Sequence, residues 1–153
     1  MEKRRLGKTN LEVSVISLGG IPLQRLNQAQ ATAVIKQCID LGINFIDTAR
    51  GYTVSEEFIG NALEELGCRD QVYLATKTMV RTYEEMKEEI EISLKNLKTD
   101  VIELYQLHLV KTREQYDLLM SDEGGYRALL EAKAEGKIKN IRITGHDEKL
   151  IEF

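Results

Sequence analysis

Apolar residues follow two different spacings along the chain, and these spacings alternate. Short apolar runs bounded by glycine or polar residues are typical of buried strands, whereas apolar residues that repeat every three or four positions indicate amphipathic helices. Short runs predict strands over residues 16–18, 43–46, 72–75, 101–107 and 138–143. Helical spacing predicts a helix after each of the first three strands, a looser helical stretch over 114–135 broken at 121–125, and the start of another helix over 146–153.

Residues suited to helix ends mark the predicted boundaries. The first helix begins at Asn27, a favourable N-cap, and ends at Gly42, which suits a left-handed C-cap. Ser55 is the predicted N-cap of the second helix, and Thr82 with Glu85 forms a predicted capping box at the start of the third. The apolar stripes predicted to face the core are Val34, Ile35, Cys38 and Ile39, then Phe58, Ile59, Ala62, Leu63 and Leu66, then Met86, Ile90, Leu94 and Leu97.

A strand followed by a helix, repeated at about 30 residues, is the signature of βα units with parallel strands. A predicted hairpin precedes them, because residues 4–6 and 13–15 flank a Gly-Lys-Thr-Asn segment. Two architectures remain open, a doubly wound sheet or a closed barrel. A (β/α)8 barrel takes about 250 residues, and this chain supplies roughly four and a half βα units. We therefore expect the chain to be part of something larger, or to be completed by self-association that covers the open edge of the sheet.

Composition narrows the classes of protein to which the chain can belong. With 42% hydrophobic and 30% charged residues, the chain can bury a core. The formal net charge of −4 argues against a general nucleic-acid binder, since such proteins carry a basic face. No apolar run approaches the ~18–20 residues needed to cross a bilayer, and no signal-peptide core follows the first residues, so we expect a cytoplasmic protein without a membrane partner. Cys38 and Cys68 form neither a disulfide framework nor a zinc set, and no metal site is expected.

Ionisable residues stand at the ends of three successive predicted strands, where we find Asp47, Lys77 and His108. In parallel βα folds the carboxyl ends of the strands share one face, so these side chains are expected to reach one crevice. Tyr52 follows Asp47 in the loop that overhangs this crevice. Each residue alone has an ordinary explanation, such as turn capping, surface solvation, a hydrogen-bonded core histidine or a loop aromatic. Their joint occurrence favours a functional site.

These four side-chain types form one coherent centre for protonating an oxygen that acquires negative charge. A tyrosine hydroxyl has a pKa near ~10, and a nearby lysine ammonium favours the phenolate and is expected to lower that pKa. Asp47 would hold Lys77 in place, and His108 could donate a hydrogen bond to a carbonyl oxygen. No serine or cysteine nucleophile with an adjacent base and no metal-ligand spacing is evident. A nicotinamide hydride is therefore the natural source of electrons.

The residues leave two other hypotheses open. Lys77 could form a Schiff base in an aldolase-like barrel, although Tyr52 and Asp47 suit that chemistry less well. Alternatively, the chain is a half-barrel without catalysis of its own, either a fragment or an associating subunit.

The segments that carry these residues resemble the active-site motifs of the aldo-keto reductases. The similar segments are Asp47–Tyr52, Thr76–Lys77 and Tyr105–His108, and residues 4–9 and 18–20 also resemble that family's N-terminal hairpin and first strand. The resemblance implies a (β/α)8 barrel, with residues 1–153 as the N-terminal part of this single domain. The complete barrel would bind NADPH, or NADH, in an extended pose and reduce a small-molecule aldehyde or ketone to an alcohol. The chain has neither a G-x-G-x-x-G nor a G-x-x-x-x-G-K motif.

The resemblance also implies roles for individual residues. Tyr52 would be the general acid, Lys77 would tune it, Asp47 would pair with Lys77, and His108 would orient the substrate carbonyl. The residues implied near the nicotinamide are Gly20, Ile21, Asp47, Thr144 and Gly145. His146 is expected either to contact the cofactor or to cap the helix that follows.

The chain departs from the family pattern at the end of the fifth predicted barrel strand. Many members carry Ser-Asn where this chain has Thr144-Gly145. Together with residues 20–25, this pair is similar to a bacterial and archaeal branch whose members often end in a ferredoxin-like iron–sulfur region, and no cluster is expected here. A half-barrel lacks part of the scaffold that would hold the site rigid, so we expect weak or no reductase activity from these residues alone.

Overall fold

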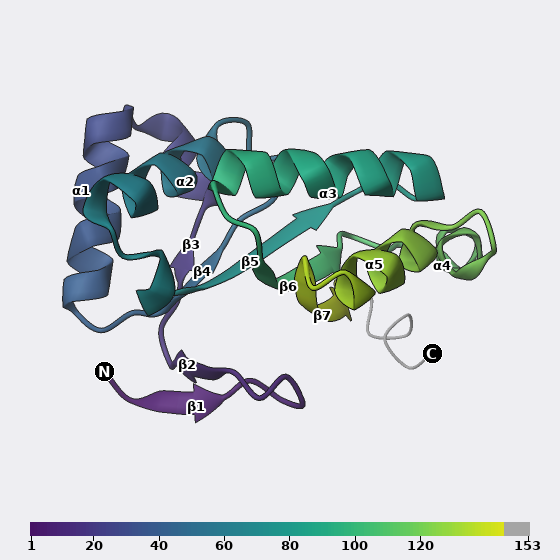
Figure 1. Ribbon diagram of the computed structural model, residues 1–153, viewed down its shortest axis with the longest axis horizontal. Coiled ribbons are helices and arrows are strands. Elements are labelled where there is room, and N and C mark those ends of the chain that lie inside the picture. The colour runs from purple at the N-terminus through teal and green to yellow at the C-terminus, as the bar shows by residue number, and fades with distance from the viewer. Residues whose placement is uncertain (146–153) are drawn as a thin grey trace.

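Five parallel strands form one sheet, and each strand lies beside the next one in the sequence (Figure 1). The computed structural model describes residues 1–145, so the predicted helix over 146–153 and His146 lie outside the described residues. The strands are β3 (Leu18–Gly19), β4 (Phe45–Asp47), β5 (Tyr73–Thr78), β6 (Ile102–Leu107) and β7 (Ile138–Ile143). All four pairings between neighbouring strands are parallel, which confirms the predicted βα pattern.

Helices connect the strands and pack beside one another in chain order. Their bounds are Gln28–Asp40 for α1, Ser55–Leu66 for α2, Tyr83–Leu97 for α3, Arg113–Met120 for α4 and Gly125–Ala134 for α5, with the short 3-10 helices η1 (Ile21–Arg25) and η2 (Arg69–Gln71). Helix α1 contacts α2, α2 contacts α3 and α3 contacts α5, so these four helices form one continuous layer (Figure 1). A doubly wound sheet would carry helices on both faces. The described residues therefore favour the barrel-type arrangement.

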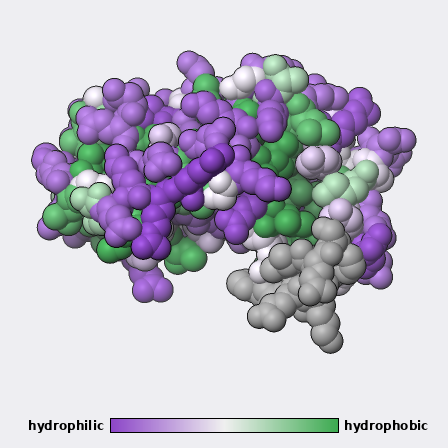
Figure 2. Space-filling view, turned by 90° about the horizontal axis from the view of Figure 1, so that it is seen from below, coloured by the Kyte–Doolittle hydropathy of each residue, from purple (hydrophilic) through white to green (hydrophobic). Residues whose placement is uncertain are grey.

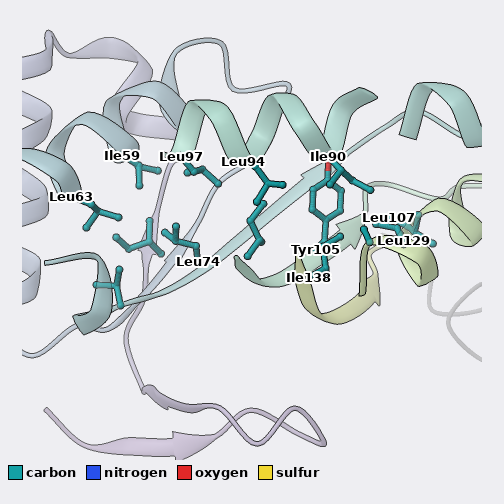
Figure 3. Close-up of a cluster of buried hydrophobic side chains, with 14 of the residues drawn as sticks. Ile59, Leu63, Leu74, Ile90, Leu94, Leu97, Tyr105, Leu107, Leu129 and Ile138 are labelled. Carbon is teal, nitrogen blue, oxygen red and sulfur yellow. The ribbon is translucent and has the colours of Figure 1, made fainter. Parts of the chain in front are cut away.

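The hydrophobic core lies between the sheet and this helix layer (Figure 3). Ile59 and Leu63 of α2 and Leu97 of α3 lie over Leu74 of β5. Because the apolar positions repeat every three or four residues, each helix buries one face. The stripes predicted for α2 and α3 are confirmed, since the buried positions include Ile59, Ala62 and Leu63 in α2 and Met86, Ile90, Leu94 and Leu97 in α3.

The apolar face of α1 differs in one position from the predicted one. Ile35 is fully buried and Cys38 is half-buried, as predicted, but Val34 is 37% exposed. Ala31 and Thr32 are buried instead. Positions 31, 35 and 38 follow the helical repeat, whereas position 34 falls beside this face rather than within it.

The predicted caps of α1 and α3 lie at the expected positions but form different contacts. The Asn27 side chain accepts a hydrogen bond from the Gln30 N–H at 2.9 Å, and the Gln30 side chain accepts one from the Asn27 N–H at 3.1 Å. At α3, the N-cap Thr82 instead donates its hydroxyl to the Glu85 carboxylate at 2.6 Å. The start of α3 is therefore confirmed, but the Thr82 half of the capping box is not formed.

Ser55 is the first residue of α2 and not its N-cap, which is Val54. Its buried hydroxyl donates to the Gly20 carbonyl oxygen at 3.0 Å and accepts a hydrogen bond from the Thr48 hydroxyl at 2.8 Å. A Cβ atom at Gly20 would lie 2.6 Å from the Ser55 Oγ. Ser55 therefore fastens the end of β3 to the start of α2, and glycine is required where the two meet.

The predicted N-terminal hairpin is present, with β1 (Lys3–Arg5) antiparallel to β2 (Glu12–Ser14). Asn44, which directly precedes β4, joins it to the sheet. The Asn44 Oδ1 accepts a hydrogen bond from the Ser14 N–H at 2.7 Å, and the Asn44 N–H donates to the Ser14 Oγ at 3.1 Å. The hairpin thus lies at the amino end of β4, at the foot of the view in Figure 1.

Candidate active site

The carboxyl ends of β4, β5 and β6 bring three predicted site residues to one edge of the sheet. Asp47 is the last residue of β4, Lys77 is the second-last residue of β5, and His108 directly follows β6. The register pairs Asp47 with Ala75 and Lys77 with Gln106. Because side chains alternate between the two faces along a strand, Asp47, Lys77 and Gln106 share the face that points away from the helix layer.

Lys77 is the most buried of the four predicted catalytic residues, with its side chain only 7% exposed. Its Nζ donates to the Asp47 carboxylate and, at 2.8 Å, to the Thr48 carbonyl oxygen. Removing an ammonium from water is costly unless an opposite charge and hydrogen bonds compensate the loss. Asp47 and the main chain provide both, so the predicted pairing of Lys77 with Asp47 is present in the structure.

Gln106 is a site residue that the sequence alone did not single out. Its Nε2 donates to the Asp47 Oδ1 at 2.9 Å, so the two carboxylate oxygens of Asp47 have separate donors in Gln106 and Lys77. Gln106 is buried, two residues before His108 in the chain. Its position in a strand predicted to be buried indicates that it needs a hydrogen-bond partner, but does not identify that partner.

Tyr52 lies in the loop between β4 and α2 and approaches both Lys77 and His108. The Lys77 Nζ lies 5.3 Å from the centroid of the Tyr52 ring. The rings of Tyr52 and His108 meet edge to face, with their centroids 6.2 Å apart and their planes at 88°. The structure thus brings the four predicted side chains together, with Asp47 joined to the group through Lys77.

The environment of Tyr52 raises the pKa of its phenol, in the direction opposite to the one expected from the sequence. Burial is the larger cause, and the negative charge of Asp47 adds to it. The ammonium of Lys77 is paired with Asp47, so the pair presents little net positive charge to the phenol. The prediction that Lys77 lowers the pKa of Tyr52 is therefore wrong for this arrangement. Tyr52 is a neutral phenol at neutral pH.

On the other face of the sheet, toward the helix layer, Arg50, Glu56 and Glu89 form what we call the outer cluster. The Arg50 Nη1 lies 3.0 Å from a Glu56 carboxylate oxygen, and its Nε lies 3.0 Å from Glu89. Burial alone would lower the pKa of the Arg50 guanidinium, but the hydrogen bonds and charges of Glu56 and Glu89 together raise it. The cluster joins the loop that carries Tyr52 to both α2 and α3.

Glu56 is the most buried charged side chain of the outer cluster, at 1% exposure. Besides the Arg50 pair, its carboxylate accepts hydrogen bonds from the Thr76 hydroxyl at 2.7 Å, the Ser93 hydroxyl at 2.8 Å and the Asn96 amide at 3.2 Å. A buried carboxylate that is stabilised by so many donors fixes the elements that supply them. Neither Glu56 nor Arg50 is evident as a functional residue from the sequence alone.

The positions predicted to contact the cofactor differ in how accessible they are. Ile21, the first residue of η1, is 46% exposed, and the side chain of Asp47 is 34% exposed. They stand at the ends of neighbouring strands, since Gly19 pairs with Asp47. Both positions are accessible, and their part in cofactor binding stays a prediction.

Thr144 and Gly145 lie against the segment that follows β6. The Thr144 hydroxyl accepts a hydrogen bond from the Leu109 N–H at 3.0 Å, and the Thr144 N–H donates to the Leu107 carbonyl oxygen at 2.9 Å. A Cβ atom at Gly145 would lie 3.2 Å from the Val110 carbonyl oxygen. These contacts give both residues a structural role next to His108, and their part in cofactor binding stays a prediction.

Residues 1–145 contain neither a helix suited to span a membrane nor a group of side chains suited to bind a metal ion. No helix in this part of the chain has the length and apolar character needed to cross a membrane. Likewise, among these residues no group of three or more histidine, cysteine, aspartate or glutamate side chains is arranged to hold a metal ion.

Comparisons with known proteins agree on one family. A sequence model of the Aldo/keto reductase family matches residues 15–152. Aldo-keto reductase YhdN of Bacillus subtilis (strain 168) is 36% identical, over 84% of this chain and 46% of its own length. Among solved structures, the holo form of aldo-keto reductase AKR11C1 from Bacillus halodurans is similar with a TM-score of 0.86 at 32% identity, covering 99% of this chain and 53% of the other.

An aldo-keto reductase from Klebsiella pneumoniae, solved in complex with NADPH, is similar with a TM-score of 0.83 at 28% identity, covering 99% of this chain and 52% of the other. The chain thus spans about half the length of the proteins it matches.

Proposed function

The chain belongs to the aldo-keto reductase family, and from this premise we propose that its residues supply the reaction centre of an NADPH-dependent reductase that converts an aldehyde or ketone to an alcohol. The fold is part of the parallel barrel of that family. One observation carries the proposal: a phenol, an ammonium and an imidazole, supplied by Tyr52, Lys77 and His108, meet at the carboxyl edge of the sheet. In barrels of this type, that edge is where catalytic residues lie.

Tyr52 is the proton donor in this proposal. Ile21 and Asp47 are the accessible positions that would hold the nicotinamide end of the cofactor, and the cofactor, when bound, supplies a hydride to the carbonyl carbon. The Tyr52 O–H donates its proton to the carbonyl oxygen, and the bond between that oxygen and the proton forms as the phenol becomes a phenolate. The raised pKa of Tyr52 keeps the phenol protonated until then. His108 is placed to orient the carbonyl oxygen by a hydrogen bond.

Lys77 and Asp47 act on the phenolate that this proton transfer leaves. The Lys77 ammonium, 5.3 Å from the centre of the Tyr52 ring, partly offsets the effect of burial and of the Asp47 charge on the phenolate. Asp47 and the Thr48 carbonyl oxygen hold that ammonium in place. Such preorganised charges act in the transition state without reorganisation of solvent.

The Schiff-base hypothesis is less consistent with these contacts. A lysine that attacks a carbonyl needs a neutral amine, and such lysines are desolvated or placed next to another cation. Lys77 is instead paired with a carboxylate and donates to a main-chain oxygen, which stabilises the ammonium. Borohydride treatment in the presence of a ketone should therefore leave Lys77 unmodified.

We also propose weak or no turnover by these residues alone. The 145 described residues provide five parallel strands, and β3 and β7 each have one neighbouring strand among them. Catalytic groups have to be held within about 0.5 Å of the productive geometry, which in this fold takes a closed barrel. The site therefore needs the support of further barrel strands for full activity.

A chimeric barrel tests the function directly. Residues 1–145 replace the matching half of YhdN, and oxidation of NADPH is followed with a small aldehyde, alongside the 153-residue chain. We expect the chimera to turn over, and Tyr52→Phe to reduce kcat by at least about 100-fold, which is the lower bound for general acid catalysis. NADPH binding, measured by nicotinamide fluorescence, should change little.

Tyr73→Phe is the matched control, because Tyr73 starts β5 at the opposite end of the strand from Lys77. It removes a tyrosine hydroxyl outside the site and should leave kcat unchanged. Undiminished turnover in Tyr52→Phe, with the chimera active, would overturn the assignment.

A further inference from the structure

We propose that Arg50 is a positioning residue that holds Tyr52 against Lys77 and His108 by anchoring the β4–α2 loop to the helix layer. The expected effect of Arg50 on catalysis rests on the proposed function. The expected effect of Arg50 on the position of Tyr52 does not, because that position can be measured without turnover.

The main chain of the loop runs along β5 beyond the end of β4. The Thr48 N–H donates to the Ala75 carbonyl oxygen at 2.8 Å, and the Arg50 N–H donates to the Lys77 carbonyl oxygen at 2.9 Å. Arg50 is therefore hydrogen-bonded through its backbone to the very residue whose side chain carries the ammonium. Its own side chain points to the opposite face of the sheet, where it meets Glu56 and Glu89.

The outer cluster is hydrogen-bonded to the residues of β5 on both sides of Lys77. The Thr76 hydroxyl donates to Glu56 at 2.7 Å, and the Thr78 hydroxyl donates to Glu89 at 2.9 Å. Because side chains alternate along a strand, the residues that flank Lys77 face the cluster while Lys77 faces the site. The two carboxylates thus fix β5 to α2 and α3. The Arg50 guanidinium, which bridges the two carboxylates, fixes the β4–α2 loop to the same two helices.

A short turn transmits this anchoring to Tyr52. The Tyr52 N–H donates to the Ala49 carbonyl oxygen at 3.0 Å, and the Ser55 N–H donates to the Tyr52 carbonyl oxygen at 2.8 Å. Tyr52 is therefore held between the Arg50 segment and the first turn of α2. The planar guanidinium suits this task because it presents donors in two directions at fixed angles, which a lysine ammonium does not.

Loss of Arg50 would release the loop for an electrostatic reason as well. Glu56 is almost completely buried, and the guanidinium is the charged group that separates it from Glu89. Without Arg50 the two carboxylates repel each other, and breaking a buried pair from one side leaves an uncompensated charge. Hydration of the two carboxylates would reduce this repulsion, and it requires the loop to move away from the helix layer.

His108 provides a local reporter for this movement, since the chain has only two histidines. The Tyr52 ring meets the His108 ring edge to face, so Tyr52 contributes a ring-current shift to the imidazole protons of His108. The test records the imidazole signals of the 153-residue chain by NMR, with His146→Gln used to assign them. Tyr52→Leu, which removes the aromatic ring, defines the shift expected when Tyr52 is absent from the site.

We expect Arg50→Met to move the His108 signals at least halfway to their Tyr52→Leu values while the helical content of the chain is retained. Arg50→Lys keeps the charge without the two-pronged geometry and should produce a smaller shift in the same direction. Arg127→Met is the matched control, because Arg127 in α5 is exposed and bonded to Glu131 outside the cluster. It should leave the His108 signals unchanged.

Unchanged His108 signals in folded Arg50→Met would overturn the proposal. If Arg50→Met does not fold, Arg50→Lys and Glu89→Gln decide the question by the same signals, because both leave Glu56 with a charged partner. No shift in either variant would then also overturn it.

In the active chimera, Arg50→Lys should lower kcat with little change in the KM for NADPH. A chimera without activity would count against the proposed function and leave the NMR result on Arg50 intact.

Discussion

At the scale of single residues, the proton on Tyr52 is controlled by burial and by the charge of one carboxylate. Both raise the pKa of the phenol, and the contribution of Asp47 is electrostatic. Asp47→Asn removes the negative charge and at the same time leaves the Lys77 ammonium without its partner. Each change favours the phenolate, so we expect the pKa of Tyr52 to fall.

Ultraviolet titration measures this shift. The difference between the absorbance titrations of a protein and of its Tyr52→Phe variant isolates Tyr52 from the other tyrosines, and it is recorded with and without Asp47→Asn. In the otherwise unchanged chain the isolated phenol should titrate above its ordinary value near ~10. A pKa of Tyr52 that stays the same or rises in Asp47→Asn contradicts the electrostatic account.

Some residues of the site can be identified from the sequence, and others can be identified only from the folded structure. Asp47, Lys77 and His108 can be predicted because each is an ionisable residue directly at a strand end, and parallel topology gathers strand ends. Gln106 and Arg50 act through contacts with residues far away in the chain, on faces whose assignment depends on strand register. A one-residue error in register reverses both faces, so their roles follow only from the folded structure.

At the scale of elements, the stability of α1 depends on which of two adjacent aliphatic residues faces the sheet. Ile35 is fully buried, whereas Val34 is 37% exposed. We expect Ile35→Ala to lower the free energy of unfolding by about 2–5 kcal/mol, since it leaves a cavity in the core. Val34→Ala should change it by no more than about 0.5 kcal/mol, as surface substitutions usually do.

Chemical denaturation of the two variants tests this orientation of α1. The pair is closely matched, because both substitutions shorten a β-branched side chain in the middle of the same helix. Equal destabilisation by Val34→Ala and Ile35→Ala would mean that α1 is rotated relative to the structure, in the direction that the sequence pattern first suggested.

Helices and strands themselves could be predicted from periodicity, but their mutual approach could not. The prediction of strand 138–143 agrees with β7, and the break at 121–125 separates α4 from α5. Gly60, in contrast, lies inside the predicted apolar stripe of α2 without an evident reason. In the structure, a Cβ atom there would lie 2.1 Å from the Asn96 carbonyl oxygen of α3. Glycine is needed because two helices touch, and hydrophobic spacing carries no information on such contacts.

At the scale of the whole molecule, the sheet has open edges within the described residues. Strands β3 and β7 each pair with one neighbour there. Figure 2, seen from below, shows a group of hydrophobic side chains right of the centre of the surface and smaller groups along its left side. An exposed strand edge and an apolar surface both promote association.

We therefore expect the 153-residue chain to self-associate reversibly through the edge of β7. The Thr144 N–H just beyond the end of this strand donates to β6, so the N–H groups of Ile143 and Ile141 point to the open side. Ile141→Pro removes one of these outward donors without removing a donor of the ladder to β6. It should weaken association, whereas Ile141→Ala, which removes the same side chain but keeps the N–H, should not.

Sedimentation equilibrium over a range of concentrations distinguishes the possible outcomes. Association that weakens in Ile141→Pro and persists in Ile141→Ala supports pairing through the main chain of β7. Association that neither variant affects would place the contact elsewhere, on the apolar surface rather than on the strand edge. A chain that stays monomeric at every concentration would show that the edge of β7 is already protected, and it would remove the physical reason for expecting these residues to need a partner.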